Sequence, residues 1–162
     1  MSERDHISIR KFRSSELIVI KRLIYNTIDV CYQQVYCKEA IKFFKDYHND
    51  ENILKGAKEG YTFVLEKNNR IIGTGTIVEE HIMRVFVIPE FQKFGFGKLI
   101  MHNLEEKALS TGVKIVKLDA SLPSKRFYDS LGYVTIEKTF LEVENGKKLD
   151  YYKMDKSLTK IG

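Results

Sequence analysis

A glycine-containing segment at residues 92–98 (QKFGFGK) follows an apolar stretch of strand composition and precedes a stretch of helical periodicity. Gly95 and Gly97 stand at alternate positions, and glycine lets backbone N–H groups converge on a ligand because no Cβ is in the way. The positive end of the following helix dipole would strengthen the attraction for an anion. The segment predicts a phosphate or pyrophosphate site, although a plain tight turn would need the same two glycines.

Two common phosphate-binding loops do not fit this segment. A Walker loop needs Ser or Thr after its lysine, and here the next residue is Leu99. A dinucleotide-binding fold would use the two glycines as its GxG and Asp119 as its ribose ligand. Ile100, however, occupies the third glycine position, and the 43 residues after Asp119 are too few for the remaining βαβ units.

The segment resembles the acetyl-CoA signature of the GNAT (Gcn5-related) N-acetyltransferases, Gln-x-x-Gly-x-Gly at the start of a helix. Ser121 followed by residues 127–133 (FYDSLGY) resembles a second element of that family, Asn or Ser and then FYxxLGF, with Tyr133 in place of the last Phe. The resemblance covers residues 61–154 well and the preceding region only in kind. It implies a mixed α/β (α+β) fold, in which helices flank both faces of a mostly antiparallel central sheet that has a splayed central strand pair.

The resemblance also implies an N-acetyltransferase that uses acetyl-CoA as a co-substrate, which a primary amine attacks directly. The amides of residues 92–98 would hold the pyrophosphate, and the backbone of residues 85–87 would pair with the pantetheine arm. The Val87 N–H would polarise the thioester carbonyl. The cofactor-binding residues predicted in this way are Val85, Phe86, Val87, Gln92, Lys93, Phe94, Gly95, Phe96, Gly97, Lys98 and Ser121.

Acyl transfer also needs a proton donor and a base. Tyr128 is the predicted donor to the departing thiolate, since a phenol has an ordinary pKa of about 10; a core aromatic is the alternative. By the resemblance, His81 stands where similar enzymes place a Glu or His base, and neutral imidazole can accept a proton at pH 7. Glu79 and Glu80 are its rivals, unless the three form only a solvated turn. The predicted catalytic residues are Tyr128, His81 and Glu80, and no metal site is expected.

Hydrophobic periodicity predicts the elements that position these residues. Strands are expected at 7–12, 61–65, 70–78, 82–88, 113–120, 133–144 and 147–154, and helices at about 14–36, 39–47, 51–58, 97–110 and 121–131. Ser14 or Ser15 should cap the first helix, and a polar tail should begin at Asp155. The acceptor is expected between the N-terminal helices and the sheet, where Tyr32 and Tyr36 either line its mouth or belong to the edge of the core.

Composition limits the class of protein. With 162 residues, of which 43% are hydrophobic, the chain is expected to form one domain over residues 1–162. Cys31 and Cys37 lack the spacing of a metal or redox pair, so we expect a reduced, cytoplasmic protein. No membrane partner is expected, because no apolar stretch is long enough to span a membrane. The net charge of +5 comes from dispersed residues, which fit a small phosphorylated ligand at least as well as nucleic acid.

Several functional alternatives stay open at this point. The acceptor could be a small-molecule or a protein amine, and a homodimer is compatible with the sequence. A non-catalytic acyl-CoA-binding sensor or partner module is the alternative to an enzyme, and a basic nucleic-acid-binding domain is a third hypothesis. Replacing Tyr128 and His81 separates the first two, because an enzyme would lose rate whereas a sensor would keep its affinity.

Overall fold

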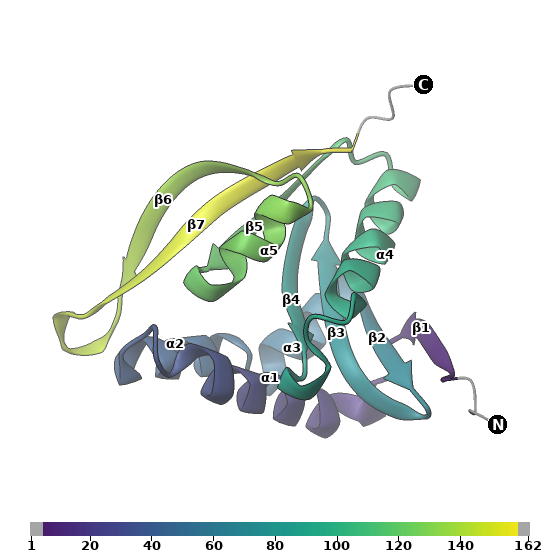
Figure 1. Cartoon of the computed structure of the whole chain (residues 1–162), viewed down its shortest axis with the longest axis horizontal. Coiled ribbons are helices and arrows are strands. Elements are labelled where there is room, and N and C mark those ends of the chain that lie inside the picture. Colours follow the sequence, from purple (N-terminus) through teal and green to yellow (C-terminus); the bar gives the residue numbers. More distant parts are fainter. Residues whose placement is uncertain (1–4, 159–162) are drawn as a thin grey trace.

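The computed structural model describes residues 5–158, which form a mixed sheet with helices on both faces (Figure 1). The sheet order is β1-β2-β3-β4-β5-β7-β6. The strands are β1 (Ile7–Lys11), β2 (Tyr61–Lys67), β3 (Arg70–Val78), β4 (His81–Val87), β5 (Ile115–Ser121), β6 (Val134–Glu142) and β7 (Lys148–Ser157). The α-helices are α1 (Leu17–Tyr32), α2 (Lys38–Tyr47), α3 (Asp50–Glu59), α4 (Phe96–Ser110) and α5 (Lys125–Ser130). Within this described part, no helix is long and apolar enough to cross a membrane.

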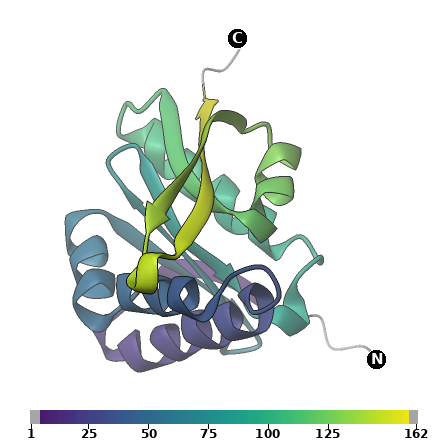
Figure 2. The same cartoon turned by 90° about the vertical axis from the view of Figure 1, so that its left-hand side faces the viewer.

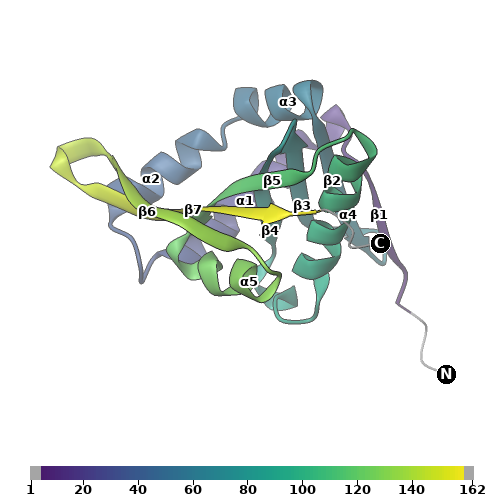
Figure 3. The same cartoon turned by 90° about the horizontal axis from the view of Figure 1, so that it is seen from above.

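Neighbouring residues of β3 show how the two faces are covered. A Cβ on Gly75 would come within 2.7 Å of the Ile100 side chain of α4, so the helix packs directly against the strand backbone there. Thr76 points to the opposite face, where its methyl group would lie 3.4 Å from a Cβ on Gly56 of α3. Figure 3 shows the resulting layers, with α4 and α5 on one side of the sheet and α2 and α3 on the other. The predicted fold class, with helices on both faces, is confirmed.

Three predicted elements had wrong boundaries. The helix expected at 121–131 begins only at Lys125, because Ser121 still belongs to β5 and a 3-10 turn at Leu122–Ser124 lies between them. The first helix ends at Tyr32 instead of about residue 36, and no serine side chain caps it. A turn of 3-10 helix at Ser14–Glu16 precedes it, where the Glu16 carboxylate accepts a hydrogen bond from the Arg13 N–H at 2.8 Å. The predicted tail from Asp155 belongs to β7, because backbone pairing with β5 continues as far as Ser157 and does not require apolar side chains.

The central strands β4 and β5 run parallel and pair at a single position, His81 with Lys117. The Lys117 N–H donates to the Glu80 carbonyl at this junction, at 2.9 Å. The two strands diverge beyond it, while β5 stays paired with β7 along its whole length. The predicted splayed strand pair is therefore present, and most of the β5-facing edge of β4 has no strand beside it.

The hairpin of β6 and β7 extends from this sheet over α2 (Figure 2). Lys42 of α2 forms an exposed ion pair with Glu144 at the hairpin tip, at 2.6 Å. The Tyr36 hydroxyl makes a more buried link, because it donates to the Asp150 carbonyl at 2.7 Å and accepts from the Leu122 N–H at 2.8 Å. The N-terminal helices and the C-terminal hairpin thus enclose the space that opens between β4 and β5.

Candidate active site

The glycine segment turns the chain from β4 into α4. Gly95 has a φ of +87°, a left-handed conformation that glycine adopts without a steric penalty, and it directly precedes the helix. Its carbonyl accepts the first helical hydrogen bond, from the Leu99 N–H at 3.1 Å. The N–H groups of residues 95–98 therefore have no helical acceptor. They are available to an anion at the positive end of the helix.

Gln92 contributes to this segment through its side chain. Its own N–H donates to the Pro89 carbonyl at 3.2 Å and so is used within the turn, unlike the free amides that follow. Its side-chain Nε2 donates to the Val87 carbonyl at 2.9 Å and lies 3.5 Å from the Cys31 Sγ. Gln92 thus fastens the segment to the end of β4.

The open edge of β4 offers backbone groups to a ligand. The Ile88 N–H donates to the Ile72 carbonyl of the neighbouring strand β3 at 2.9 Å, and Val87 lies opposite Gly73. Hydrogen-bonded and non-hydrogen-bonded pairs alternate in an antiparallel ladder. The Val87 N–H is therefore directed away from β3, toward the space in front of β5, as the sequence analysis predicted for the amide that meets the thioester carbonyl.

A cavity of about 450 Å³ lies between this edge, the glycine segment, α1 and α5; we call it the loop cavity. Eight of the eleven predicted cofactor-binding residues line it: Val85, Phe86, Val87, Gln92, Lys93, Gly95, Gly97 and Lys98. The other three do not. The Phe94 side chain is exposed, Phe96 packs on Phe91 with ring centroids 6.1 Å apart, and the Ser121 hydroxyl bonds to that of Ser124 at 2.7 Å. The signature therefore located the cavity, while its aromatic residues point elsewhere.

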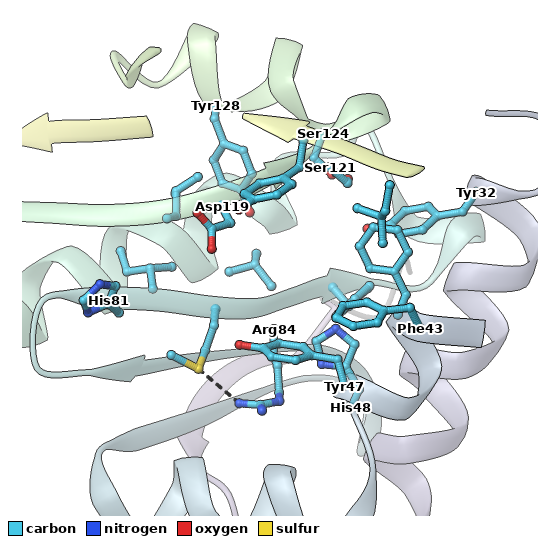
Figure 4. Close-up of a pocket in the computed structure, with 18 of the residues that line it drawn as sticks. Tyr32, Phe43, Tyr47, His48, His81, Arg84, Asp119, Ser121, Ser124 and Tyr128 are labelled. Atoms are coloured by element: carbon cyan, nitrogen blue, oxygen red, sulfur yellow. Dashed lines mark hydrogen bonds between the residues drawn. The ribbon is translucent and has the colours of Figure 1, made fainter. Parts of the chain in front are cut away.

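A second cavity of about 240 Å³ lies between the diverging strands and α2; we call it the splay cavity (Figure 4). It shares five lining residues with the loop cavity: Tyr32, Val85, Phe86, Ser124 and Tyr128. Ser121 lines the splay cavity only. The two cavities thus meet at a common wall, which is where two reacting molecules would come into contact.

Tyr128 forms part of this common wall. Its ring packs edge-on against Phe127 and Tyr133, with centroids 5.1 and 5.7 Å away. Burial raises the pKa of the Tyr128 phenol, and the neighbouring Tyr32 raises it further. Within residues 5–158 its hydroxyl makes no hydrogen bond to another residue, and the residue lines both cavities. Tyr128 therefore stays protonated at neutral pH and is free to donate.

The two tyrosines at the end of the first helix have different roles. Tyr32 lines both cavities, and burial raises the pKa of its phenol more than hydrogen bonding from Ser121 and Ser124 lowers it. Tyr36 lines neither cavity, because its hydroxyl joins the hairpin and the turn before α5. Tyr32 thus lines the space predicted for the acceptor, whereas Tyr36 belongs to the edge of the core.

The predicted bases lie at one end of the splay cavity. His81 lines it, is exposed, and has its Nδ1 3.6 Å from the Glu80 carboxylate. Glu80 itself lines neither cavity, and Glu79 forms the turn with a φ of +56°. Asp119 of β5 also lines the splay cavity (Figure 4), close enough to His81 for the imidazolium charge to lower its pKa. The sequence analysis considered Asp119 only as a ribose ligand.

The environment of Asp119 suits a proton acceptor. The residue is exposed overall, but partial burial of its carboxyl raises the pKa, while the charges of Lys153 and His81 oppose that rise. Lys153 is its register partner on β7. The sequence signal for Asp119 was its place near the end of a predicted strand, just before the Ser121 of the second motif.

Arg84 is the second residue that the sequence analysis missed. It interrupts an otherwise apolar strand interior, and its side chain is buried in the wall of the splay cavity beside His48. The strand has a bulge there, because Thr76 lies opposite Met83 while Thr74 lies opposite Phe86. A charged residue within an apolar strand was the signal for it.

Residues 32–158 match the model of a protein family described as an acetyltransferase (GNAT) domain. A Bacillus subtilis (strain 168) protein that is named provisionally as an acetyltransferase is 33% identical over 58 residues, which are 36% of this chain and 40% of that protein. The uncharacterized protein YyaT of the same strain is 31% identical over 78 residues, 46% of this chain and 53% of YyaT. The matches thus span about half the length of these relatives.

Solved structures share the fold. A GCN5-related N-acetyltransferase of Rhodopseudomonas palustris superimposes with a TM-score of 0.85 at 20% identity, over 93% of this chain and 95% of that one. PaiA N-acetyltransferase of Thermoplasma acidophilum, solved with coenzyme A, gives 0.72 at 16% identity over 94% and 99%. YncA of Salmonella typhimurium, solved with acetyl-CoA, gives 0.67 at 17% identity over 97% and 96%.

Proposed function

Since the chain belongs to the GNAT acetyltransferase family, we propose that it transfers the acetyl group of acetyl-CoA to a primary amine that attacks the thioester directly. The observation that carries this proposal is the common wall of the two cavities, where Tyr128 and the free edge of β4 meet. A donor in the loop cavity and an acceptor in the splay cavity would come together at this wall. Holding two reactants in contact removes much of the entropic barrier to their reaction.

The loop cavity suits acetyl-CoA, which would supply the activated acetyl group. The free N–H groups before the first helical bond of α4 would hold the pyrophosphate, with charge from Lys93 and Lys98. The edge of β4 would pair with the amides of the pantetheine arm in the manner of an added strand. PaiA and YncA, which share this fold, are solved with coenzyme A and acetyl-CoA respectively, and this supports the assignment.

The chain supplies the remaining chemical roles at the common wall. The Val87 N–H would stabilise the oxyanion that develops on the thioester carbonyl. Tyr128 would donate a proton to the departing thiolate, because its raised pKa keeps the phenol protonated. Asp119 would act as the base, since it lines the splay cavity with a raised pKa, and the exposed His81, whose charge acts on it, would extend the proton path toward solvent.

Release of free thiol from acetyl-CoA in the presence of an amine panel tests the proposal. We expect wild type to turn over at least one amine and Tyr128→Phe to lose most of the rate while keeping its affinity for acetyl-CoA. Bound acetyl-CoA without turnover of any amine would favour the sensor alternative. Cys31 lines the loop cavity, so Cys31→Ala separates direct attack, which it should leave intact, from transfer through the thiol.

A further inference from the structure

Arg84 is a buried cation without an anionic partner. The residue is 8% exposed, and within residues 5–158 no carboxylate lies within ion-pair distance of its guanidinium. Its Nη1 donates only to the Met83 sulfur, at 3.1 Å, and its Nε is buried with no acceptor. The Tyr47 ring lies over the guanidinium at 5.4 Å (Figure 4). Thioether sulfur and an aromatic face replace only part of the hydration that the charge loses.

Local structure is arranged to keep this residue in place. Arg84 adopts a φ of +53° at the bulge of β4, a conformation that costs a non-glycine residue roughly 1 kcal/mol or more. Gly56 of α3 leaves room for the side chain, since a Cβ there would come within 2.9 Å of Nη1. An unpaired arginine in a strained and tightly fitted position adds nothing evident to folding. Such a group is explained if its partner is a ligand.

The other ionisable groups that face the splay cavity are arranged around this cation. His48 lies beside Arg84 and is neutral, because burial and the arginine charge lower its pKa to about 3. Asp119 also lines the cavity, and within residues 5–158 no ion pair joins it to Arg84. His81 lies at the far end. The cavity is thus lined by one buried cation and by groups that can accept a proton, among apolar side chains such as Leu118.

We propose that the acetyl acceptor is a small amine that also carries an anionic group, as an amino acid carries its carboxylate, and that Arg84 binds this group. The inference rests on the proposed function, which places the amine near Asp119 and Tyr128. A guanidinium offers several N–H donors in a planar fork that matches a carboxylate. A cavity of about 240 Å³ and the small exposure of Arg84 fit a small molecule rather than a folded protein.

Binding of matched ligand pairs tests this proposal without relying on turnover. In the presence of saturating coenzyme A, the melting temperature of wild type is measured with apolar α-amino acids, their carboxamides and the corresponding aminophosphonates. A pair consists of one of the two anions and the carboxamide with the same side chain. We expect the anionic member of at least one pair to bind more tightly than the carboxamide by about 10- to 100-fold, as for charge-assisted hydrogen bonds. The aminophosphonates show whether the site prefers a carboxylate or a doubly charged anion.

Variants assign the preference to Arg84. We expect Arg84→Gln to lose it and Arg84→Lys to keep part of it, because lysine retains the charge but not the planar fork. The control Arg22→Gln removes an exposed arginine of α1 and should behave as wild type. The melting-temperature shift caused by coenzyme A alone reports whether Arg84→Gln is folded, since Arg84 does not line the loop cavity.

Equal binding of the two members of every pair to wild type would overturn the proposal, as would a full preference in a folded Arg84→Gln. Thiol release with the same ligands is scored separately. Anion-selective binding without turnover of any amine would contradict the proposed function and leave the ligand assignment in place. Turnover that is equally fast with carboxamides and carboxylates would support the proposed function and contradict the assignment of the anionic group to Arg84.

Discussion

Gln92 donates a hydrogen bond from its side-chain Nε2 to the carbonyl oxygen of Val87, at 2.9 Å. This bond joins the two parts of the loop cavity that would hold opposite ends of one ligand, the glycine segment and the open edge of β4. The Gln92 N–H is already bonded within the turn. The shape of the loop cavity therefore depends on the Gln92 side chain, while the Gln92 N–H, already bonded within the turn, would not bind the pyrophosphate.

Gln92→Ala should weaken coenzyme A binding about fivefold, since one hydrogen bond is worth about 1 kcal/mol and its loss frees the glycine segment. Titration calorimetry measures the change. The control is Asn103→Ala, which removes a side-chain amide that bonds only to the Leu99 carbonyl within α4. An unchanged affinity in Gln92→Ala would mean that the segment holds its shape without this bond.

Gly97→Val should abolish the rise in melting temperature that coenzyme A causes. A Cβ at this position meets the Phe127 ring at 3.0 Å, so a larger side chain must fill the loop cavity or displace α5. Gly95→Ala is expected to destabilise the fold by roughly 1 kcal/mol through its left-handed backbone and to reduce the shift only in part.

Gly112→Ala is the matched control for these two variants. Gly112 has a φ of +84° with no atom near its added Cβ, almost as at Gly95, but it lies at the other end of α4. It should lose similar stability and keep the whole shift. A full coenzyme A shift in Gly97→Val would contradict the assignment of the loop cavity.

Tyr128→Phe should lower kcat by about 100-fold, a typical contribution of a positioned proton donor. Because burial raises the pKa of Tyr128, its phenol stays protonated below pH 10, and any alkaline fall in the wild-type rate below that pH must have another origin. The control is Tyr133→Phe, since the buried Tyr133 hydroxyl has no hydrogen-bond partner among residues 5–158 and the residue lines neither cavity. Its loss should leave kcat unchanged and raise stability. Equal rates for Tyr128→Phe and wild type would exclude Tyr128 as the donor.

Lys153→Met should move the acidic limb of the pH–rate profile to higher pH if Asp119 is the base. The Lys153 charge lowers the pKa of Asp119, so its removal lets that pKa rise further, and the carboxylate is then lost earlier as the pH falls. The shift should be largest at low salt, because both groups are exposed. Lys114→Met, just before β5, is the control. A limb that moves in His81→Ala but not in Lys153→Met would assign the base to His81.

Stability should fall in mild acid because of His48. Its pKa is lowered to about 3 in the folded protein, so between pH 6.5 and about 3 the unfolded chain binds a proton that the native chain does not. The free energy of unfolding should drop with falling pH in this window, by up to about 1.4 kcal/mol per unit. Urea unfolding of His48→Phe should show a smaller slope than wild type, whereas His102→Gln, at an exposed site, should not. Equal slopes would mean that other groups dominate.

The helices and strands that depend on local sequence patterns could be predicted from the sequence. The periodicity of α4 and the composition of β4 identify both elements, and the two glycines mark the turn between them, where the anion site is predicted. Element ends were less certain, because tertiary pairing extends β7 past Asp155 and the turn after Tyr32 ends α1. The identity of the acceptor, a homodimer and a cytoplasmic location stay predictions.

The splay cavity could not be predicted, because it arises from contacts between distant segments. The single pairing of His81 with Lys117 leaves the strands free to diverge, and no local pattern encodes one pair instead of several. Asp119 faces a cavity only because β4 turns away from β5. Arg84 is buried because Tyr47 of α2 and Gly56 of α3 pack against its guanidinium. The residue types at these two positions suggest a chemical role. Their burial and their contacts in the folded chain determine which role that can be.

The wall that the two cavities share also makes their occupants energetically dependent on each other. Tyr128, Val85 and Phe86 would touch a ligand on either side, so a molecule in one cavity fixes the side chains that the other must meet. Linkage requires the effect to be reciprocal: if the acceptor tightens coenzyme A binding, coenzyme A tightens acceptor binding by the same factor. If both ligands bind as proposed, the divergence of two strands would give the protein cooperativity between unlike ligands within a single subunit.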